Sequence, residues 1–290
     1  MAQFLVQAVV VLYKSTVAGS ATMQSLQTIF AAEPQLADQV SLLVYDNSPE
    51  AQDPSWQQTP GAKALGSSLR YEHDSSNGGL AKAYGVALRM AVAQGSEWLL
   101  LLDQDTTLSA AFFRQLLAAL AAGPMDSVCA IVPRQVRDGA VLSPRLVRRD
   151  RDLPVDDGVA TERLTVFNSA ACVRVKALLA IGGFPGEFPL DYLDHVVFHR
   201  LQAAGGRLLV LPIHIEHQLS VKNLAEEMSL GRYKRLLVAE WGFIREVKPK
   251  GGVPLQRVKL LLRALGQARM PNKTFARETL AAAFASQPRR

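Results

Sequence analysis

Residues Glu97 to Asp105, with the sequence EWLLLLDQD, constrain the fold of this 290-residue chain more than any other segment. The apolar run from Trp98 to Leu102 is unbroken, whereas a strand with one exposed face would alternate apolar and polar residues. The run therefore predicts a central strand buried on both faces, as in a parallel sheet covered by helices on both sides. It is far shorter than the ~18–20 apolar residues that cross a membrane, and we expect no membrane-spanning segment.

Other short apolar runs alternate with amphipathic stretches through the first 215 residues. The runs predict strands over residues 6–13, 40–48, 69–74, 97–105, 166–173 and 207–215, and the amphipathic stretches predict helices over residues 21–30, 80–94, 110–122, 176–181 and 194–204. Two polar, proline-containing segments, residues 49–68 and 134–157, are expected to be loops, the second one mobile.

This alternation predicts an α/β fold with a mostly parallel central sheet flanked by helices. In such sheets, ligands bind at the carboxyl ends of the strands. After about residue 221 the sequence is helical in pattern. We therefore expect one domain over residues 1–222 and a basic helical region over residues 223–290.

The composition favours a folded chain in a reducing compartment. With 49% apolar residues a sizeable core is available, and the two cysteines, Cys129 and Cys172, stand in apolar contexts without metal-ligand spacing. We therefore expect neither a disulfide framework nor a zinc site. The apolar stretch from Met1 to Tyr13 lacks the basic residues that begin a secretory signal, so we favour a strand there.

The net charge of +6 comes from the C-terminal part of the chain. Residues 248–290 hold ten Lys and Arg and one acid, a net +9, so the first 247 residues carry −3. Such a region suggests an anionic partner, either lipid headgroups or nucleic acid. Nucleic acid is disfavoured, because aromatic residues are sparse among the basic ones and no recognition motif is present.

Apolar and basic residues share one C-terminal stretch, Pro254 to Arg269. The apolar residues that recur there at helical spacing are Val258, Leu261, Leu262 and Leu265, and the basic ones beside them are Arg257, Lys259 and Arg263. This pattern is typical of a helix lying in a membrane interface, and equally of a helix packed on the main domain with its basic face in water.

The two carboxylates of Asp103-Gln104-Asp105 follow the Leu-rich strand. Closing a buried strand with two acids is costly unless a positive charge lies beside them, and a divalent cation such as Mg²⁺ or Mn²⁺ that bridges phosphate oxygens supplies it. The alternative is a strand end that turns into a helix, with Asp105 or Thr106 as a local cap. The position after an unbroken apolar strand favours the metal site.

Further polar clusters end strands or open helices: Asp46-Asn47-Ser48, Asn77-Gly78-Gly79, the pair Asp191 and Asp194, and the pair His214 and His217. Asp and Asn can bind a ribose or a base, glycines let a phosphate approach backbone N–H groups, one acid can be a general base, and imidazole can bind a metal. Each cluster also has a structural interpretation as a turn, a helix cap or a strand end.

Taken in order, these segments resemble the inverting glycosyltransferases of family 2, which have the GT-A fold, and look closest to the rhamnosyltransferase-like branch. The matching segments are VVVLYKS, LLVYDNS, NGGLAKA, EWLLLLDQDT, FNSAACVRVKAL, IGGFPGEFPLDYLD and IEHQLS, within residues 6–220. The chain departs from the family at Tyr84-Gly85, where an Asn is common, at Val196 in place of an acid, and after His217, where the family tends toward a glycine.

The resemblance implies a role for each cluster. On the donor side, Asp46 would contact the nucleoside, Leu12 and Tyr13 would wall the base, Asn77 and Gly79 would lie along the ribose and diphosphate, and Asp103, with Gln104 beside it, would approach the ribose or a metal-bound water. Asp105 and His217 would ligate the cation. Asp194 would be the base that deprotonates the acceptor hydroxyl, and Asp191 would hold the acceptor or substitute as base.

The resemblance also implies an activity. We expect a metal-dependent inverting hexosyltransferase that moves a sugar, with rhamnose as the first candidate, from a dTDP- or UDP-sugar to a hydroxyl of a growing, lipid-linked cell-surface glycan such as lipopolysaccharide. Such an enzyme would be cytoplasmic and peripheral on the inner face of the membrane. Two alternatives stay open: a non-catalytic GT-A-like binding module, and a nucleotidyltransferase, which the lack of a Gly-rich basic loop after the first strand disfavours.

Overall fold

The computed structural model describes residues 5–122, 125–148, 151–153, 155–216, 228–247, 252–270 and 272–285. The chain divides into two compact units. The first comprises residues 1–189 and 193–218, and the second comprises residues 190–192 and 219–290. Each unit is described by itself below.

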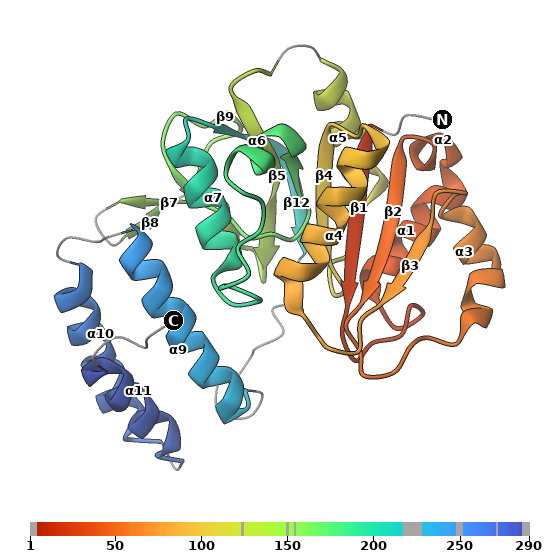
Figure 1. Ribbon diagram of the computed structural model, residues 1–290. Helices are drawn as coiled ribbons and strands as arrows, with labels where there is room; N and C mark the ends of the chain where they lie inside the picture. Colours follow the sequence, from red (N-terminus) through yellow and green to blue (C-terminus); the bar gives the residue numbers. More distant parts are fainter. Residues whose placement is uncertain are drawn as a thin grey trace. The chain divides into compact units, whose positions relative to one another are not determined.

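The first unit is built on a sheet with the strand order β3-β2-β1-β4-β11-β5-β12-β9, with β6 paired to β5 (Figure 1). The strands are β1 (Val6–Leu12), β2 (Val40–Asp46), β3 (Arg70–His73), β4 (Trp98–Asp103), β5 (Val128–Arg137), β6 (Ala140–Ser143), β9 (Gly158–Val159), β11 (Ala171–Arg174) and β12 (Arg207–Glu216). The strands β1 to β4 pair in parallel, β12 is parallel to β5, and β11 runs antiparallel between β4 and β5. The expected α/β architecture with a mostly parallel central sheet is confirmed.

Helices cover both faces of this sheet, as the unbroken apolar run predicted. On one face, alternate residues of β1 and β4 such as Val10 and Leu102 join a core with α1 (Ala21–Ala32) and α5 (Ala110–Ala121). The intervening residues of the strands are buried too, and α4 (Gly79–Gln94) packs against β1 and β4. The remaining helices are α2 (Pro34–Ala37), α3 (Pro60–Ala64), α6 (Val175–Ala180) and α7 (Leu193–Ala203), with a 3₁₀ helix at Pro54–Gln58.

The prediction of a mobile loop over residues 134–157 is wrong, because the segment contains strands. The chain continues from β5 into β6 through Asp138 and Gly139, whose φ angles of 49° and 76° are those of a tight hairpin turn. It then forms β7 (Arg145–Arg148) and β8 (Arg151–Leu153), which make a small antiparallel sheet with β10 (Leu164–Thr165). Paired strands satisfy backbone groups locally, so a charged surface segment can still be ordered.

Two other expectations need smaller corrections. The loop expected over residues 49–68 contains the 3₁₀ helix and α3, which begin at prolines and are capped by the side chains of Asp53 and Thr59. The strand expected over residues 166–173 is limited to β11, because Ala170 adopts a left-handed φ of 58° that an extended strand does not allow.

In the parts of the second unit that the structure describes, the helices are α9 (Leu230–Val247), α10 (Gly252–Gln267) and α11 (Thr274–Phe284). Its core is formed by Met228, Tyr233, Leu237, Trp241, Leu260, Phe275 and Ala283. Beside this core the buried carboxylate of Glu240 accepts two hydrogen bonds of 2.8 Å from Arg263. The expected helical C-terminal region is therefore present. Among the helices that the structure describes, none has the length and apolarity needed to cross a bilayer.

Candidate active site

The polar residues that follow β2 and β4 lie at one edge of the sheet because the strands are parallel and in register. Leu12, the last residue of β1, pairs with Asp46 of β2, and Val11 pairs with Asp103 of β4. The two acids therefore flank the carboxyl end of β1. This is the edge at which sheets of this type bind ligands.

The Asp46 carboxylate is fully buried and bonded within the protein. It accepts hydrogen bonds of 2.9 Å from the Ser48 backbone N–H, the Gln52 amide and the Tyr71 hydroxyl. Burial alone would raise the pKa of Asp46, but these hydrogen bonds outweigh it and hold the pKa below its ordinary value. Asp46 is thus a stable anion that ties the loop after β2 to β3.

Gln104 also binds within the protein. Its side-chain oxygen accepts a 2.8 Å hydrogen bond from the backbone N–H of Tyr13, and its carbonyl accepts one of 2.7 Å from the Ser20 hydroxyl. The Thr22 hydroxyl donates to the carbonyl of Asp103. The turn after β4 is therefore braced by the loop after β1 and by the start of α1. Tyr13, in contrast, is 42% exposed, and the Lys14 ammonium lies 5.3 Å from the centre of its ring.

Three carboxylates gather around the end of β4. Burial, the charge of Asp105 and the charge of Asp194 raise the pKa of Asp103 to about 7, although the Tyr84 hydroxyl, 3.3 Å from the Asp103 carboxylate, opposes the shift. Asp194 lies in the first turn of α7 and accepts a 2.7 Å hydrogen bond from the His195 backbone N–H. Burial raises the pKa of Asp194 against the opposing charge of His195. Burial and the nearness of two further acids therefore both disfavour the charged form of Asp103.

The glycine-rich turn at residues 77–79 opens α4, as expected. Asn77 and Gly79 have positive φ angles of 49° and 78°. An added Cβ at Gly79 would lie 2.4 Å from the carbonyl oxygen of Pro189, which accepts a 3.2 Å hydrogen bond from Ala81. The Asn47 side chain reaches the Gly79 carbonyl at 3.4 Å. The turn thus touches both the loop after β2 and the segment that leads toward Asp194.

Three further residues that the sequence singled out are Asp191, His214 and His217. Asp191 belongs to the second unit, where its carboxylate lies 3.8 Å from the Arg232 guanidinium. His217 lies outside the described residues, whereas His214 is exposed on β12. Within the described ranges, no group of three His, Cys, Asp or Glu side chains is arranged to hold a metal ion.

The chemistry of the donor set nevertheless fits a hard divalent cation. Mg²⁺ and Mn²⁺ prefer oxygen ligands and commonly use one or two carboxylates, with substrate phosphates and water completing the shell. Asp103 and Asp105 supply such oxygens, and burial, followed by the charge of Asp105, raises the pKa of Asp103 to about 7.

Tyr84, Gln52 and Tyr71 are site residues whose contacts the sequence did not indicate. Tyr84 is fully buried, packs against the ring of Phe184 at 5.3 Å and donates to Asp103. In the sequence, Tyr84 stood out only because proteins of family 2 commonly have an Asn near this position. Gln52 stands in the segment expected to be a loop, and no local signal links it or Tyr71 to Asp46.

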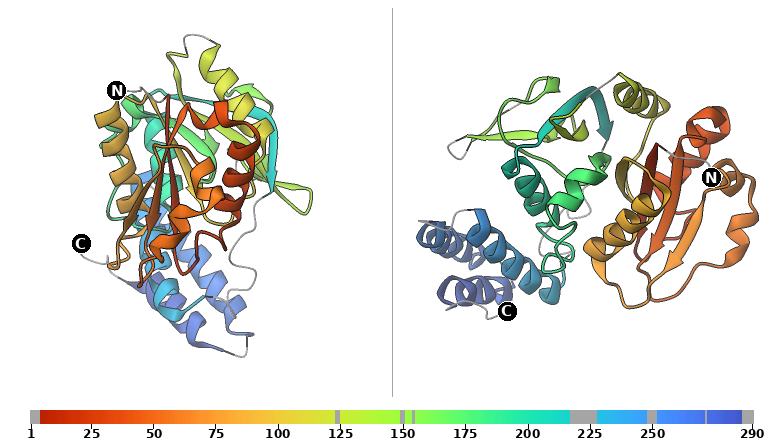
Figure 2. Two further views of the ribbon diagram at one scale, coloured as in Figure 1. Left: turned by 90° about the vertical axis from the view of Figure 1, so that its right-hand side faces the viewer. Right: turned by 45° about the horizontal axis from the view of Figure 1, so that its top comes forward.

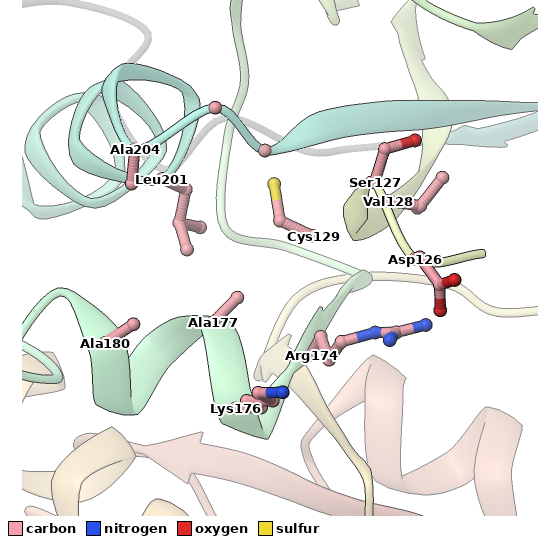
Figure 3. A pocket seen from close by; sticks show the side chains of 12 residues that line it. Asp126, Ser127, Val128, Cys129, Arg174, Lys176, Ala177, Ala180, Leu201 and Ala204 are labelled. Atoms are coloured by element: carbon pink, nitrogen blue, oxygen red, sulfur yellow. The ribbon is translucent and has the colours of Figure 1, made fainter.

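A hollow of about 400 Å³ opens at the other end of the sheet, where β5 and β12 begin (Figure 3). Asp126, Cys129, Arg174 and Lys176 are among the residues that line it. The Arg174 guanidinium stacks 4.9 Å from the Trp98 ring and donates to the Met125 carbonyl at 3.1 Å. This hollow is therefore separate from the carboxylates at the carboxyl edge.

The family model described as glycosyl transferase family 2 matches residues 26–174, about half of the chain. The chain belongs to this family. Its match includes β2, the glycine turn, the Asp103-Gln104-Asp105 segment and β11. No protein of curated function matches the sequence significantly.

Solved structures with GT-A sheets show the same fold at low identity. Two of them are GalNAc-T7 with UDP, GalNAc and Mn²⁺ (TM-score 0.62, 13% identity, covering 96% of this chain and 54% of that one) and TarS of S. aureus (0.54, 16%, 94% and 55%). A shorter TarS chain, residues 1–349 in complex with UDP-GlcNAc, is similar too (0.54, 13%, 96% and 79%). The chain spans just over half the length of the first two proteins.

Proposed function

We propose that this protein is a metal-dependent inverting glycosyltransferase that moves a sugar from a nucleoside diphosphate to a hydroxyl of a glycan. The observation that carries the proposal is the gathering of Asp103, Asp105 and Asp194 at the ligand-binding edge of a family 2 sheet. A diphosphate leaving group needs positive charge, and a hydroxyl nucleophile needs one positioned base. This edge offers carboxylates for both tasks.

The donor would occupy the ends of β1, β2 and β4. Tyr13 is exposed to stack on the base beside Leu12, Asn77 and Gly79 would follow the ribose and diphosphate, and Asp103 would approach the ribose. Since the Asp46 carboxylate is engaged with Ser48, Gln52 and Tyr71, contact with the nucleoside would replace one of those bonds. Gln104 would act by holding the loop after β1 in place.

A divalent cation, Mg²⁺ or Mn²⁺, would neutralise the departing diphosphate, with Asp105 and His217 as its protein ligands. The structures of similar fold include complexes with UDP and Mn²⁺ and with UDP-GlcNAc, which supports a nucleotide-sugar donor. A UDP- or dTDP-sugar is our first choice, and rhamnose is the first sugar to test.

Asp194 would remove the proton from the acceptor hydroxyl as its oxygen attacks the anomeric carbon. The new C–O bond forms while the bond to the diphosphate breaks, so the electron pair leaves on the phosphate and the configuration inverts. Burial raises the pKa of Asp194, which makes its carboxylate a stronger base than an exposed one. Asp191 is the alternative base or acceptor ligand.

The acceptor we propose is a growing, lipid-linked cell-surface glycan. The catalytic domain would be residues 1–222, and residues 223–290 would keep the enzyme at the cytoplasmic face of the membrane. A non-catalytic GT-A-like module that only binds nucleotide sugar is the second candidate, since residue types common in the family are replaced at Tyr84 and Val196.

The first experiment is a thermal shift of the purified protein with UDP-, dTDP- and GDP-sugars in Mn²⁺, Mg²⁺ or EDTA. A ligand at 100 times its dissociation constant stabilises the folded state by about 2.7 kcal/mol. We expect a rise in melting temperature that EDTA removes. No rise across the panel, in a folded sample, contradicts a donor site.

Three charge-removing variants then separate the roles. Asp105→Asn should lose the metal-dependent shift, whereas Asp194→Asn should keep it and lose roughly 10²–10⁴-fold in transfer rate. Asp38→Asn is the matched control, because Asp38 is exposed before β2, at the opposite edge of the sheet. Donor binding with undiminished transfer by Asp194→Asn would show that another group is the base.

A further inference from the structure

Helix α10 is apolar on a face that points away from its own core. Leu255, Val258, Leu262 and Leu265 follow one another at spacings of three and four residues, so they share one side of the helix. Their side chains are 45%, 51%, 63% and 64% exposed, whereas Leu260, on the opposite side, is fully buried in the core of the second unit. Four large apolar side chains in a row at these exposures are more than scattered surface residues.

Helix α11 continues this apolar surface. The two helices pack against each other, with α10 and α11 side by side in both figures (Figures 1 and 2). Leu280 is 45% exposed and Phe284 is 69% exposed. Between the helices lies a groove of about 470 Å³, lined by Leu261, Ala264, Leu265, Ala268, Lys273, Ala276, Arg277 and Leu280. We call the exposed faces of α10 and α11, with this groove, the outer helical face.

The charge on the outer helical face is positive. Lys273, Arg277, Leu280 and Phe284 share one side of α11, so two cations stand in line with two exposed apolar side chains. Glu278 is the one acid in the described parts of α10 and α11, and it is paired with Lys234 at 3.0 Å. The cations at the groove are therefore not neutralised by acids of these two helices.

We infer that the outer helical face binds the surface of an anionic lipid bilayer, with the apolar side chains inserted and Lys273 and Arg277 at the phosphates. A bilayer satisfies both properties together, since it offers hydrocarbon beneath a layer of negative charge. A second copy of the chain would cover the apolar residues but would bring like charges together across a symmetric contact, which disfavours it. The inference concerns the second unit and does not depend on the sugar-transfer chemistry.

The test is sedimentation of the full chain with vesicles of phosphatidylcholine alone or with phosphatidylglycerol added. We expect binding to the anionic vesicles that weakens at high salt, because each basic residue near such a surface contributes about fivefold in affinity. Lys273→Gln with Arg277→Gln should therefore weaken binding by about 25-fold. Equal binding to neutral vesicles, or insensitivity to salt, would overturn the inference.

The apolar contribution is tested with Leu262→Gln and Leu265→Gln together. We expect at least a tenfold loss of vesicle binding, with an unchanged melting curve because both side chains are exposed. The control is Val92→Gln with Leu179→Gln, which removes two apolar residues of the first unit that are 51% and 53% exposed. A loss that is equal in both pairs would contradict a specific lipid-binding face.

Two further readouts separate this inference from its rivals. The wild-type chain could fail to bind vesicles and instead form a dimer that the double variant Leu262→Gln with Leu265→Gln no longer forms. In that case the outer helical face joins two copies of the chain, and the inference is wrong. The nucleotide-sugar thermal shift, measured on the same variants, should be unchanged. Vesicle binding without any nucleotide shift would refute the proposed transfer and leave the lipid-binding face standing.

Discussion

Replacing Gly79 by alanine should destabilise the first unit, and the structure gives two independent reasons. The residue has a φ of 78°, which costs an L-amino acid about 1–2 kcal/mol relative to glycine. The new Cβ would also lie 2.4 Å from the Pro189 carbonyl oxygen and 3.0 Å from its carbon, both backbone atoms. Since no side chain can rotate away, the backbone must move.

The loss of stability expected for Gly79→Ala can be estimated from this displacement of the Pro189 backbone. Displacing Pro189 weakens the 3.2 Å hydrogen bond from Ala81, and forcing atoms into a filled space typically costs about 1–3 kcal/mol. Together with the backbone strain, we expect Gly79→Ala to lower the free energy of unfolding by about 2–4 kcal/mol. For a unit of this size that corresponds to a melting temperature lower by roughly 5–15 °C.

The same helix supplies a control with the opposite sign. Gly85 lies inside α4 with an ordinary φ, and an added Cβ would meet only the Arg89 side chain at 3.8 Å. Gly85→Ala should therefore raise the free energy of unfolding by about 0.5–1 kcal/mol, because alanine loses less backbone entropy in a helix. Urea denaturation followed by tryptophan fluorescence, to which the buried Trp98 contributes, compares the two variants. Equal stability of the two would refute the reasoning.

Three further predictions concern charge and burial. Burial and the Asp105 charge raise the pKa of Asp103 to about 7, so the metal-free protein should lose stability as pH rises from about 4 to about 7. Asp103→Asn should raise the free energy of unfolding by up to about 4 kcal/mol at pH 8 and by much less at pH 4. Urea denaturation in EDTA measures both. Arg263→Leu leaves the Glu240 carboxylate buried without its ion pair, so denaturation of the second unit should show a loss of about 3–5 kcal/mol. Burial raises the pKa of Cys129 to about 11, so mass spectrometry should find it alkylated at pH 8 only after unfolding.

The core of the sheet was predictable because its signal is local. The unbroken run of β4 and the apolar run of β1 each require burial on two faces. An Asp-Gly pair favours a tight hairpin turn, so residues 138 and 139 carry a local signal for the turn between β5 and β6. The loop prediction for residues 134–157 followed the charges around this pair and was wrong.

The hydrogen-bond partners within the site were not predictable, because they join residues that are distant in sequence or lie in segments without periodicity. Tyr84 meets Asp103 only when α4 packs on β4, and Tyr71 meets Asp46 only when β3 pairs with β2. Such contacts depend on the tertiary fold and leave no mark on the local pattern.

Two acids at the same sheet edge end up in opposite electrostatic states, and the difference indicates where a ligand's positive charge belongs. Asp46 receives three hydrogen bonds, which lower its pKa despite complete burial, so its charge is already balanced by the protein. Burial and the charge of Asp105 raise the pKa of Asp103, and the hydrogen bond that its carboxylate accepts from Tyr84 does not offset them. The protein's own donors therefore stabilise the charged form of Asp46, whereas burial and nearby acids disfavour the charged form of Asp103. A cation at Asp105 would correct that imbalance, whereas one at Asp46 would have to displace bonds that already exist.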